Sequence, residues 1–212
     1  MTNYYPIYMK LDYKKVVIVG GGHVAVQKVA TLRDTKAIIT IISPDLHPQL
    51  LPLAEEGVIT WYKKSFEPKD LDDATLIIAA TNNKEVNDAV QEASQHWQLV
   101  NRADEQQASD FITPAIVRRG SLIISVSTSG ASPSLARRLK DELAQQFDEA
   151  YEDYLDFLQQ ARLLICSKFE KGEKRSALLK ALMAPEVLEW TRVGDVLARE
   201  TFLQKLLVGE SL

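Results

Sequence analysis

Residues 16–25 read Val-Val-Ile-Val-Gly-Gly-Gly-His-Val-Ala, and this stretch decides the fold. The β-branched run at 16–19 predicts a buried strand, because such side chains favour extended backbone. Three small residues follow at G-x-G-x-x-A spacing, namely Gly20, Gly22 and Ala25. Apolar residues then recur at helical intervals, so a strand, a glycine turn and a helix are predicted in that order. This order is typical of a dinucleotide-binding turn.

Each position of the turn has a physical role in holding a pyrophosphate. Gly20 permits the tight turn, Gly22 lets the backbone approach the phosphates, and Ala25 lets the helix and strand pack closely. The helix beginning near His23 offers free N–H groups and a positive dipole end. The backbone of His23 and Val24 is therefore expected to face the phosphates. The alternative is an ordinary βα unit with a glycine turn that binds nothing.

A second predicted strand, at 38–42, runs into Ser-Pro-Asp at 43–45. An acidic residue at this point accepts hydrogen bonds from a ribose 2′-OH and repels a 2′-phosphate. We therefore expect Pro44 and Asp45 to face the adenosine ribose, and we expect NAD rather than NADP as the cofactor. Alternatively, Asp45 caps the helix that is predicted after Pro44.

Strands and helices alternate through the first half of the chain. Further strands are expected at 58–62, 74–80 and 99–100, with helices at 46–56 and 84–97. The alternation predicts an α/β fold with a Rossmann-type doubly wound parallel sheet. Such sheets bind ligands beyond the carboxyl ends of their strands. Thr81 and Asn82 follow the fourth strand at that edge and are expected to line the nicotinamide side.

The pattern changes after residue 110. Two strand-like runs, at 111–117 and 121–127, flank a short Arg-Arg-Gly turn and predict an antiparallel hairpin. A helix is expected at 134–147, and the rest of the chain reads as all helical. The predicted division is a Rossmann domain at 1–110, a hairpin and helix region at 111–147, and a helical C-terminal domain at 148–212.

The composition is that of an ordinary globular protein, with 46% hydrophobic and 25% charged residues among 212. The sequence has no run of about 18 apolar residues, which a membrane span requires. It shows no basic segment before an apolar core, as a secretory signal does. Cys166 is the single cysteine, so an intrachain disulfide is excluded. We expect a cytoplasmic protein that does not bind membranes.

The formal net charge is −4, but residues 101–140 carry six basic and three acidic side chains. Such a local surplus attracts an anionic ligand. The alternative is that these arginines form a solvated surface. A basic block this small in an acidic protein argues against nucleic-acid binding.

Several segments together resemble the precorrin-2 dehydrogenase family, which comprises NAD-dependent enzymes of siroheme biosynthesis. Members of this family also form the N-terminal part of siroheme synthases. The matching segments are Pro6–Met9, Val19–Ala25, Ala79–Asn83, Val100–Asp104, Asp110–Ala115 and Ser125–Arg137. They occur in the family's order across residues 1–140. The last segment, a serine- and glycine-rich turn followed by S-P-x-L-A-R, is the most specific.

The resemblance implies oxidation of precorrin-2 to sirohydrochlorin with reduction of NAD, by a homodimer whose dimerisation region includes the hairpin. Some relatives also insert ferrous iron, so a bifunctional dehydrogenase and ferrochelatase is one alternative. If this protein does not insert iron, a separate chelatase is needed to convert sirohydrochlorin to siroheme. The chain stops where longer synthases continue into a methyltransferase, so that module is expected to be absent. A non-catalytic NAD-binding regulatory dimer is a second hypothesis, and a Rossmann oxidoreductase that acts on a small substrate is a third.

Asp104 matches the family aspartate that is assigned a central catalytic role. A carboxylate near the nicotinamide can accept a proton during dehydrogenation. Orientation of the substrate is the other role left open. A purely structural role is also possible, in which Asp104 is a turn residue paired with Arg102.

The carboxylates of precorrin-2 require an electropositive pocket. The expected substrate-binding residues are Arg118, Arg119, Arg137 and Arg138, with Ser132 and Ser134 at a helix N-terminus. Arg137 and Arg138 alternatively form salt bridges between subunits. The side chain of His23 is expected at the rim of the pocket, and His47 and His96 at the surface. We expect no metal site, because no histidine, cysteine and carboxylate cluster has ligand spacing.

Overall fold

The computed structural model describes residues 4–208. They form two compact units, which divide between Thr113 and Pro114. The predicted division at residues 110 and 147 stays a prediction. Among the helices in the described part of the chain, none is long and apolar enough to cross a membrane.

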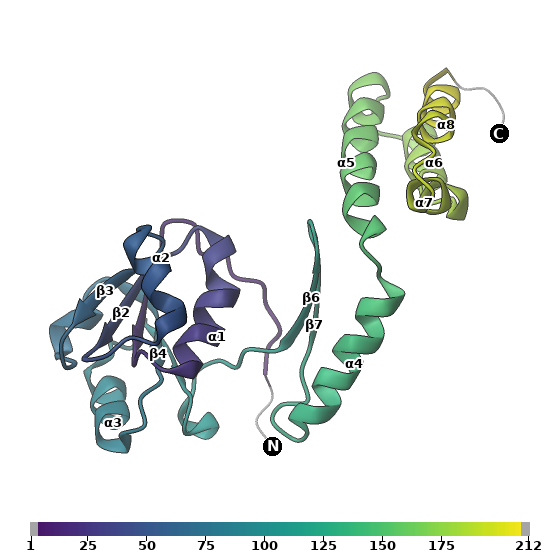
Figure 1. Cartoon of the computed structure of the whole chain (residues 1–212). Helices are drawn as coiled ribbons and strands as arrows, with labels where there is room; N and C mark the ends of the chain where they lie inside the picture. Colours follow the sequence, from purple (N-terminus) through teal and green to yellow (C-terminus); the bar gives the residue numbers. More distant parts are fainter. Residues whose placement is uncertain (1–3, 209–212) are drawn as a thin grey trace. The chain divides into compact units, whose positions relative to one another are not determined.

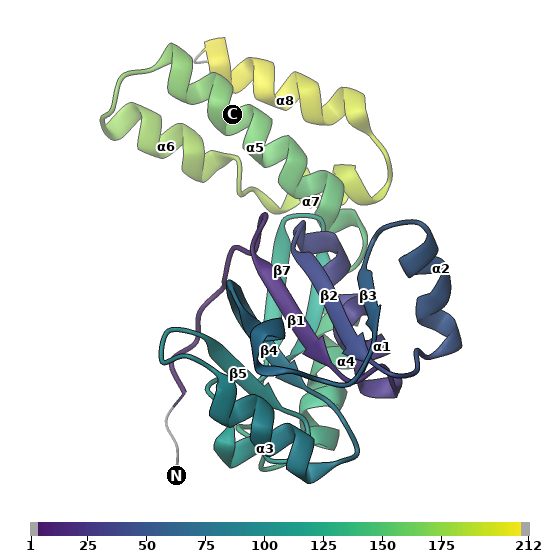
Figure 2. The same ribbon diagram turned by 90° about the vertical axis from the view of Figure 1, so that its left-hand side faces the viewer.

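The first unit contains a parallel sheet flanked by helices (Figure 1), and the strand order is β3-β2-β1-β4-β5 (Figure 2). Its strands are β1 (Lys15–Val19), β2 (Ile38–Ser43), β3 (Thr60–Lys63), β4 (Ala74–Ala79) and β5 (Leu99–Arg102), and its helices are α1 (His23–Leu32), α2 (Leu51–Glu55) and α3 (Lys84–Ala93). This order reverses direction beside β1, as in dinucleotide-binding sheets. The predicted Rossmann-type sheet is confirmed.

Two hydrophobic layers form because successive side chains of a strand face opposite sides of the sheet. On one side, Val16 and Ile18 of β1 pack with Val29 of α1. On the other side, Val17 and Val19 pack in a second cluster that includes Val90 of α3. The continuous apolar run of β1 therefore serves both faces at once.

Two predicted helices are shorter than expected. The first predicted helix, at 46–56, is a 3-10 turn at Pro48–Leu50 followed by α2. The second, at 84–97, ends at Ala93. The reason lies in Gln98, whose buried amide donates to the carbonyls of Leu71 and Ala74 at 2.7 and 3.0 Å. That contact pulls the chain away from the helix axis and into β5.

The outer edge of β5 is covered by the segment that follows it. Val100 donates its N–H to Asp110 Oδ2 at 2.8 Å, and the Asp110 N–H donates back to the Val100 carbonyl at 2.8 Å. Asn101 Nδ2 donates to the Phe111 carbonyl at 2.9 Å. These bonds satisfy an otherwise open sheet edge. They also confine residues 103–108 to a short loop, which carries Asp104.

The second unit begins with the antiparallel hairpin β6 (Ala115–Arg119) and β7 (Leu122–Val126), as predicted. Arg118 and Arg119 belong to β6 rather than to the turn, which is made at Gly120 with φ +52°. The helices are α4 (Pro133–Gln146), α5 (Ala150–Lys168), α6 (Glu173–Ala181), α7 (Pro185–Arg192) and α8 (Val196–Val208). Helix α5 runs between α6 and α8 (Figure 2), and its buried Phe157 and Ile165 belong to their shared core.

Candidate functional site

The glycine turn brings the end of β1 against its two neighbouring strands. Gly20 has φ +114°, and a Cβ there would stand 2.7 Å from the Ala80 carbonyl carbon at the end of β4. A Cβ on Gly21 would stand 2.5 Å from Ser43 Oγ at the end of β2. The turn is therefore packed on both sides, and only residues without side chains fit these two positions.

Gly22 is different, because a Cβ added there meets nothing within 4 Å. It is the N-cap of α1, and the helix has neither a side-chain cap nor an acidic residue in its first turn. The exposed His23 and half-buried Val24 follow it. The positive end of α1 is thus open toward solvent, which is the arrangement that binds a pyrophosphate.

A cleft of about 390 Å³ lies at the carboxyl ends of β1, β2 and β4, where the strand order reverses. It is lined by Val19, Gly20, Ile42, Ser43, Pro44, Ser65, Phe66, Thr81, Asn82, Asn83 and Val86. Four predicted cofactor residues belong to this wall: Gly20, Pro44, Thr81 and Asn82. The remaining four, Gly22, His23, Val24 and Asp45, lie outside the lining.

Ser65 and Phe66 line the cleft but were missed by the sequence analysis. They follow β3 at the carboxyl edge of the sheet. Their position directly after a strand could have identified them from the sequence. In a parallel sheet the segments that follow the strands all lie at the same edge, where ligands bind.

Of the two histidines beside the turn, His47 differs from the expectation that it lies at the surface. The rings of His23 and His47 lie 4.4 Å apart between centroids, and the His47 N–H donates to the Gly21 carbonyl at 2.8 Å. His47 is half-buried and caps the turn that follows it, since its Nδ1 accepts from the Gln49 N–H at 3.3 Å. The hypothesis that Asp45 is the cap is therefore wrong, and Asp45 is exposed.

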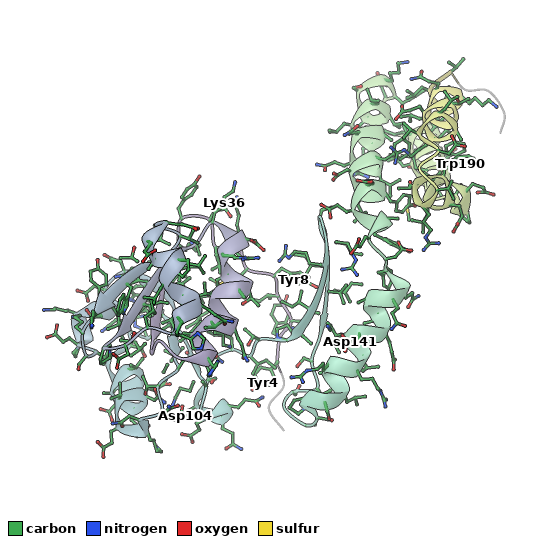
Figure 3. All side chains as sticks on the ribbon, in the orientation of Figure 1. Tyr4, Tyr8, Lys36, Asp104, Asp141 and Trp190 are labelled. Atoms are coloured by element: carbon green, nitrogen blue, oxygen red, sulfur yellow. The ribbon has the colours of Figure 1, made fainter. Side chains whose placement is uncertain are left out.

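Asp104 is held by a bidentate ion pair with Arg102, which is the pairing expected if the aspartate has a structural role. Arg102 Nη2 lies 2.8 Å from Asp104 Oδ2, and Nε lies 3.2 Å from Oδ1. This contact lowers the pKa of Asp104 to about 2, although burial opposes the shift. The side chain is therefore an anion at neutral pH. Figure 3 shows Asp104 near α3 in the first unit.

The other side of Arg102 contacts helix α3. Arg102 Nη1 lies 2.6 Å from Asp88 Oδ1, and Lys84 Nζ lies 2.9 Å from Asp88 Oδ2. Hydrogen bonds from these two cations lower the pKa of Asp88, and the bond from Lys84 has a larger effect than the bond from Arg102. The Arg102 side chain is 4% exposed, so its charge is neutralised within the protein rather than by water.

Asn87 connects Asp104 to the wall of the cleft and was missed by the sequence analysis. It is 1% exposed, and its Oδ1 accepts from Thr81 Oγ1 at 2.8 Å. Its Nδ2 donates to the Thr81 carbonyl at 3.1 Å, and a hydrogen bond from Asn87 also lowers the pKa of Asp104. The sequence does contain a signal for Asn87, because this polar residue lies on the same face of the helix as the apolar Val86 and Val90.

The predicted substrate-binding arginines all lie in the second unit and have different surroundings. Arg118 and Arg137 are exposed. Arg138 is also exposed and lies 3.4 Å from Glu142. Arg119 donates to the carbonyls of Arg118 and Ala144 at 2.9 and 3.1 Å, so its guanidinium joins β6 to the last turn of α4.

Ser132 caps α4, because its Oγ accepts from the Leu135 N–H at 3.3 Å. Ser134 is exposed, with its Oγ 3.3 Å from that of Ser132. Ser132 also donates its N–H to Thr128 Oγ1 at 3.1 Å. The roles of these serines in substrate binding stay predictions. Within residues 4–208 we find no group of three histidine, cysteine or acidic side chains placed to hold a metal.

Two family models match the chain. Residues 7–115 match a family described as "Putative NAD(P)-binding", and residues 119–146 match one described as "Sirohaem biosynthesis protein central". The first match spans the parallel sheet and the cleft. The second spans the last residue of β6, the hairpin turn, β7 and α4.

Individual relatives extend this result. The precorrin-2 dehydrogenase of Bacillus subtilis is 38% identical over 157 residues, which cover 74% of this chain and 97% of that protein. The siroheme synthase of Methylobacillus flagellatus is 35% identical over 96% of this chain. The chain spans 44% of that synthase's length. The solved structure of SirC, a precorrin-2 dehydrogenase, aligns with a TM-score of 0.80 and 28% identity, covering 96% of this chain and 98% of that chain.

Proposed function

The chain belongs to the precorrin-2 dehydrogenase family, and on that premise we propose that it oxidises precorrin-2 to sirohydrochlorin with NAD as the electron acceptor. The observation that carries the proposal is the open N-terminus of α1 above a packed glycine turn. Gly22 leaves room where a pyrophosphate approaches, and the helix holds no carboxylate there to repel it.

The residues around the cleft fit NAD. Gly20, Pro44, Thr81 and Asn82 line the cleft. In the proposed complex the pyrophosphate lies against Gly20 and the open Gly22, the adenosine ribose meets Pro44 and the exposed Asp45, and Thr81 and Asn82 face the nicotinamide side. His23 and Val24 contribute backbone N–H groups. The exposed Asp45 favours NAD over NADP, because it repels a 2′-phosphate. When bound, NAD supplies the hydride acceptor.

The protein supplies a fixed negative charge through Asp104. Since Arg102 holds the pKa of Asp104 at about 2, this carboxylate stays ionised throughout the neutral range. It is suited to orienting the tetrapyrrole and to stabilising positive charge that develops on it as the hydride leaves. As a proton acceptor it is weak, because a base with so low a pKa has little affinity for a proton.

Arg118, Arg137 and Arg138 are our proposed contacts to the carboxylates of the substrate, together with Ser132 and Ser134 at the N-terminus of α4. Their exposure supports this assignment, since an arginine fork pairs well with a carboxylate. Arg119 is the weakest member of the set, because its guanidinium already donates to two backbone carbonyls.

We further propose a homodimer in the cytoplasm. Several large apolar side chains are exposed in the single chain, and they include Tyr5, Ile7, Tyr8, Met9, Ile116 and Leu135. Exposed apolar surface of this kind marks an interaction site. A second copy that covers the hairpin and α4 would bury part of it.

The deciding experiment is an anaerobic assay of the purified protein with enzymatically generated precorrin-2 and NAD. We expect NADH and the sirohydrochlorin spectrum to appear together. Ferrous iron is then added, and conversion to a metallated product would make the protein a dehydrogenase and chelatase. A product that stays metal-free requires a separate chelatase. NAD binding without NADH formation would overturn the proposal and leave a regulatory NAD-binding dimer.

A further inference from the structure

A buried cation joins Asp104 to helix α3. Arg102 is the last residue of β5, and its side chain is 4% exposed. One edge of its guanidinium faces both oxygens of Asp104, and the remaining nitrogen, Nη1, lies 2.6 Å from Asp88. A third carboxylate, that of Glu105, is more distant at 3.8 Å from Nη2.

We propose that Arg102 and Asp88 are positioning residues for precorrin-2 oxidation: Arg102 holds the carboxylate of Asp104 in one orientation, and Asp88 holds Arg102. The proposal rests on the proposed function, in which Asp104 acts on the tetrapyrrole. Neither Arg102 nor Asp88 needs to touch the substrate for this role.

The geometry supports positioning rather than charge balance alone. A guanidinium that donates from Nε and Nη2 to two oxygens fixes the plane of the carboxylate, which a single contact does not. A lysine at this position supplies the same charge as a point and leaves the carboxylate free to turn. Asp88 restrains the far end of the guanidinium, so that the fork itself has one orientation.

The location of the network adds a second argument. Asp88 and Asn87 are neighbours on α3, and Asn87 hydrogen-bonds Thr81 in the wall of the cleft. The same helix therefore sets the position of Thr81 on one side and of Arg102 on the other. The contacts of Asn87 with Thr81 and of Asp88 with Arg102 therefore fix the position of Asp104 relative to the cleft. A displacement of about 1 Å at a reacting group is enough to cost up to about a hundredfold in rate.

The test compares Arg102→Lys and Asp88→Asn with Glu105→Gln as the matched control. Glu105→Gln removes one negative charge near Arg102, as Asp88→Asn does, but it removes only the long contact. For each variant the readouts are kcat and KM for NAD with precorrin-2, the dissociation constant for NAD, the melting temperature, and kcat between pH 5 and 8.

We expect Arg102→Lys to lower kcat about tenfold or more and Asp88→Asn to lower it about threefold to tenfold. KM for NAD should stay within about twofold, since the pyrophosphate contacts are untouched. Glu105→Gln should match the wild type. In Arg102→Lys the shape of the kcat profile between pH 5 and 8 should stay the same, because Asp104 remains ionised there even at the ordinary aspartate pKa of about 3.9, so the loss of kcat reports orientation rather than loss of charge.

Two results would overturn the inference. One is wild-type kcat in both Asp88→Asn and Arg102→Lys while Asp104→Asn is inactive, which leaves Asp104 catalytic without a positioning network. The other is an equal loss in Glu105→Gln and Asp88→Asn, which reduces the effect to general electrostatics. If Arg102→Lys does not fold, Asp88→Asn still decides, because Asp88 is 38% exposed. Failure of the proposed function itself is distinct, since the wild type would then produce no NADH.

Discussion

Gly20 at the end of β1 lies so close to Ala80 at the end of β4 that a Cβ on the glycine would stand 2.7 Å from the Ala80 carbonyl carbon. Two turns of the chain that are 60 residues apart thus meet across the sheet. Gly22 faces open space two residues later. The fold therefore requires glycine at positions 20 and 21 of the turn but not at position 22.

We expect Gly20→Ala to destabilise the protein by about 2 kcal/mol or more, because it adds a steric clash to a backbone with φ +114°. Gly22→Ala should change the free energy of unfolding by less than about 1 kcal/mol. It should nevertheless weaken NAD binding about tenfold or more, since the methyl group takes the place of a phosphate oxygen. Urea unfolding and calorimetric titration with NAD measure the two effects. Wild-type affinity in Gly22→Ala would contradict the proposed pyrophosphate position.

Asp45→Ser should allow NADP to bind more tightly by about tenfold, because the repulsion of the 2′-phosphate is removed. The affinity for NAD should fall slightly, as a ribose hydroxyl loses an acceptor. Titration of both cofactors checks the ratio. Glu56→Gln removes an exposed negative charge elsewhere and is the control. A ratio that is the same in Asp45→Ser and the wild type would remove the structural basis for NAD selectivity.

Asp104 should stabilise the fold at neutral pH and lose that effect in acid. Its pKa is about 2 in the folded state and about 3.9 in an unfolded chain, so the unfolded state takes up the proton first. The contribution is present above about pH 5 and disappears as the pH falls toward 2. Asp104→Asn should cost about 1 kcal/mol at pH 7 and only a small part of that at pH 2, where about half of the carboxylate is protonated. Urea unfolding at both pH values tests this, and a cost that does not depend on pH would show that the ion pair contributes nothing.

Arg118 and Arg119 are adjacent but should respond differently to removal. Arg119→Ala should destabilise the second unit by about 1 kcal/mol, because the carbonyl of Ala144 loses its donor. Arg118→Ala should leave stability unchanged and raise KM for precorrin-2, if its exposed guanidinium meets a substrate carboxylate. Melting curves and steady-state kinetics on both variants separate the roles. A loss of stability in Arg118→Ala together with a raised KM in Arg119→Ala would show that Arg118 is the structural residue and Arg119 the substrate contact.

Lys28 of α1 donates to Asn101 Oδ1 at 3.0 Å and to Thr113 Oγ1 at 2.7 Å, and burial lowers its pKa from the ordinary 10.5. The unfolded chain therefore binds this proton more tightly than the folded chain does. At neutral pH the lysine is charged in both states, so burial of the charge lowers the free energy of unfolding by its full amount. That cost is relieved as the pH rises toward 10.5. The wild type should gain stability relative to Lys28→Met between pH 7 and 10. Exposed Lys14→Met is the control, and an equal pH dependence in both variants would contradict the prediction.

The sequence alone was sufficient for the first strand, the glycine turn and α1, because each depends on residues within ten positions of one another. The alternation of strands and helices also indicated that the sheet is parallel, since such connections return the chain to the same edge of the sheet before each strand. The same reasoning placed Thr81 and Asn82 at the correct edge. Element ends were less certain, and α3 ends early because of Gln98, whose partners Leu71 and Ala74 precede the helix.

Only the tertiary structure decided how the polar side chains pair. No sequence interval relates Arg102 to Asp88, or His23 to His47, because these contacts form where crossover connections bring separate strands and helices together. Pairing also depends on which side of each element a residue faces, and on what already occupies the space opposite. For that reason the sequence by itself determined where the site lies, at the carboxyl edge of a Rossmann-type sheet, while the tertiary structure decided that Arg102 is held between Asp104 and Asp88 of α3.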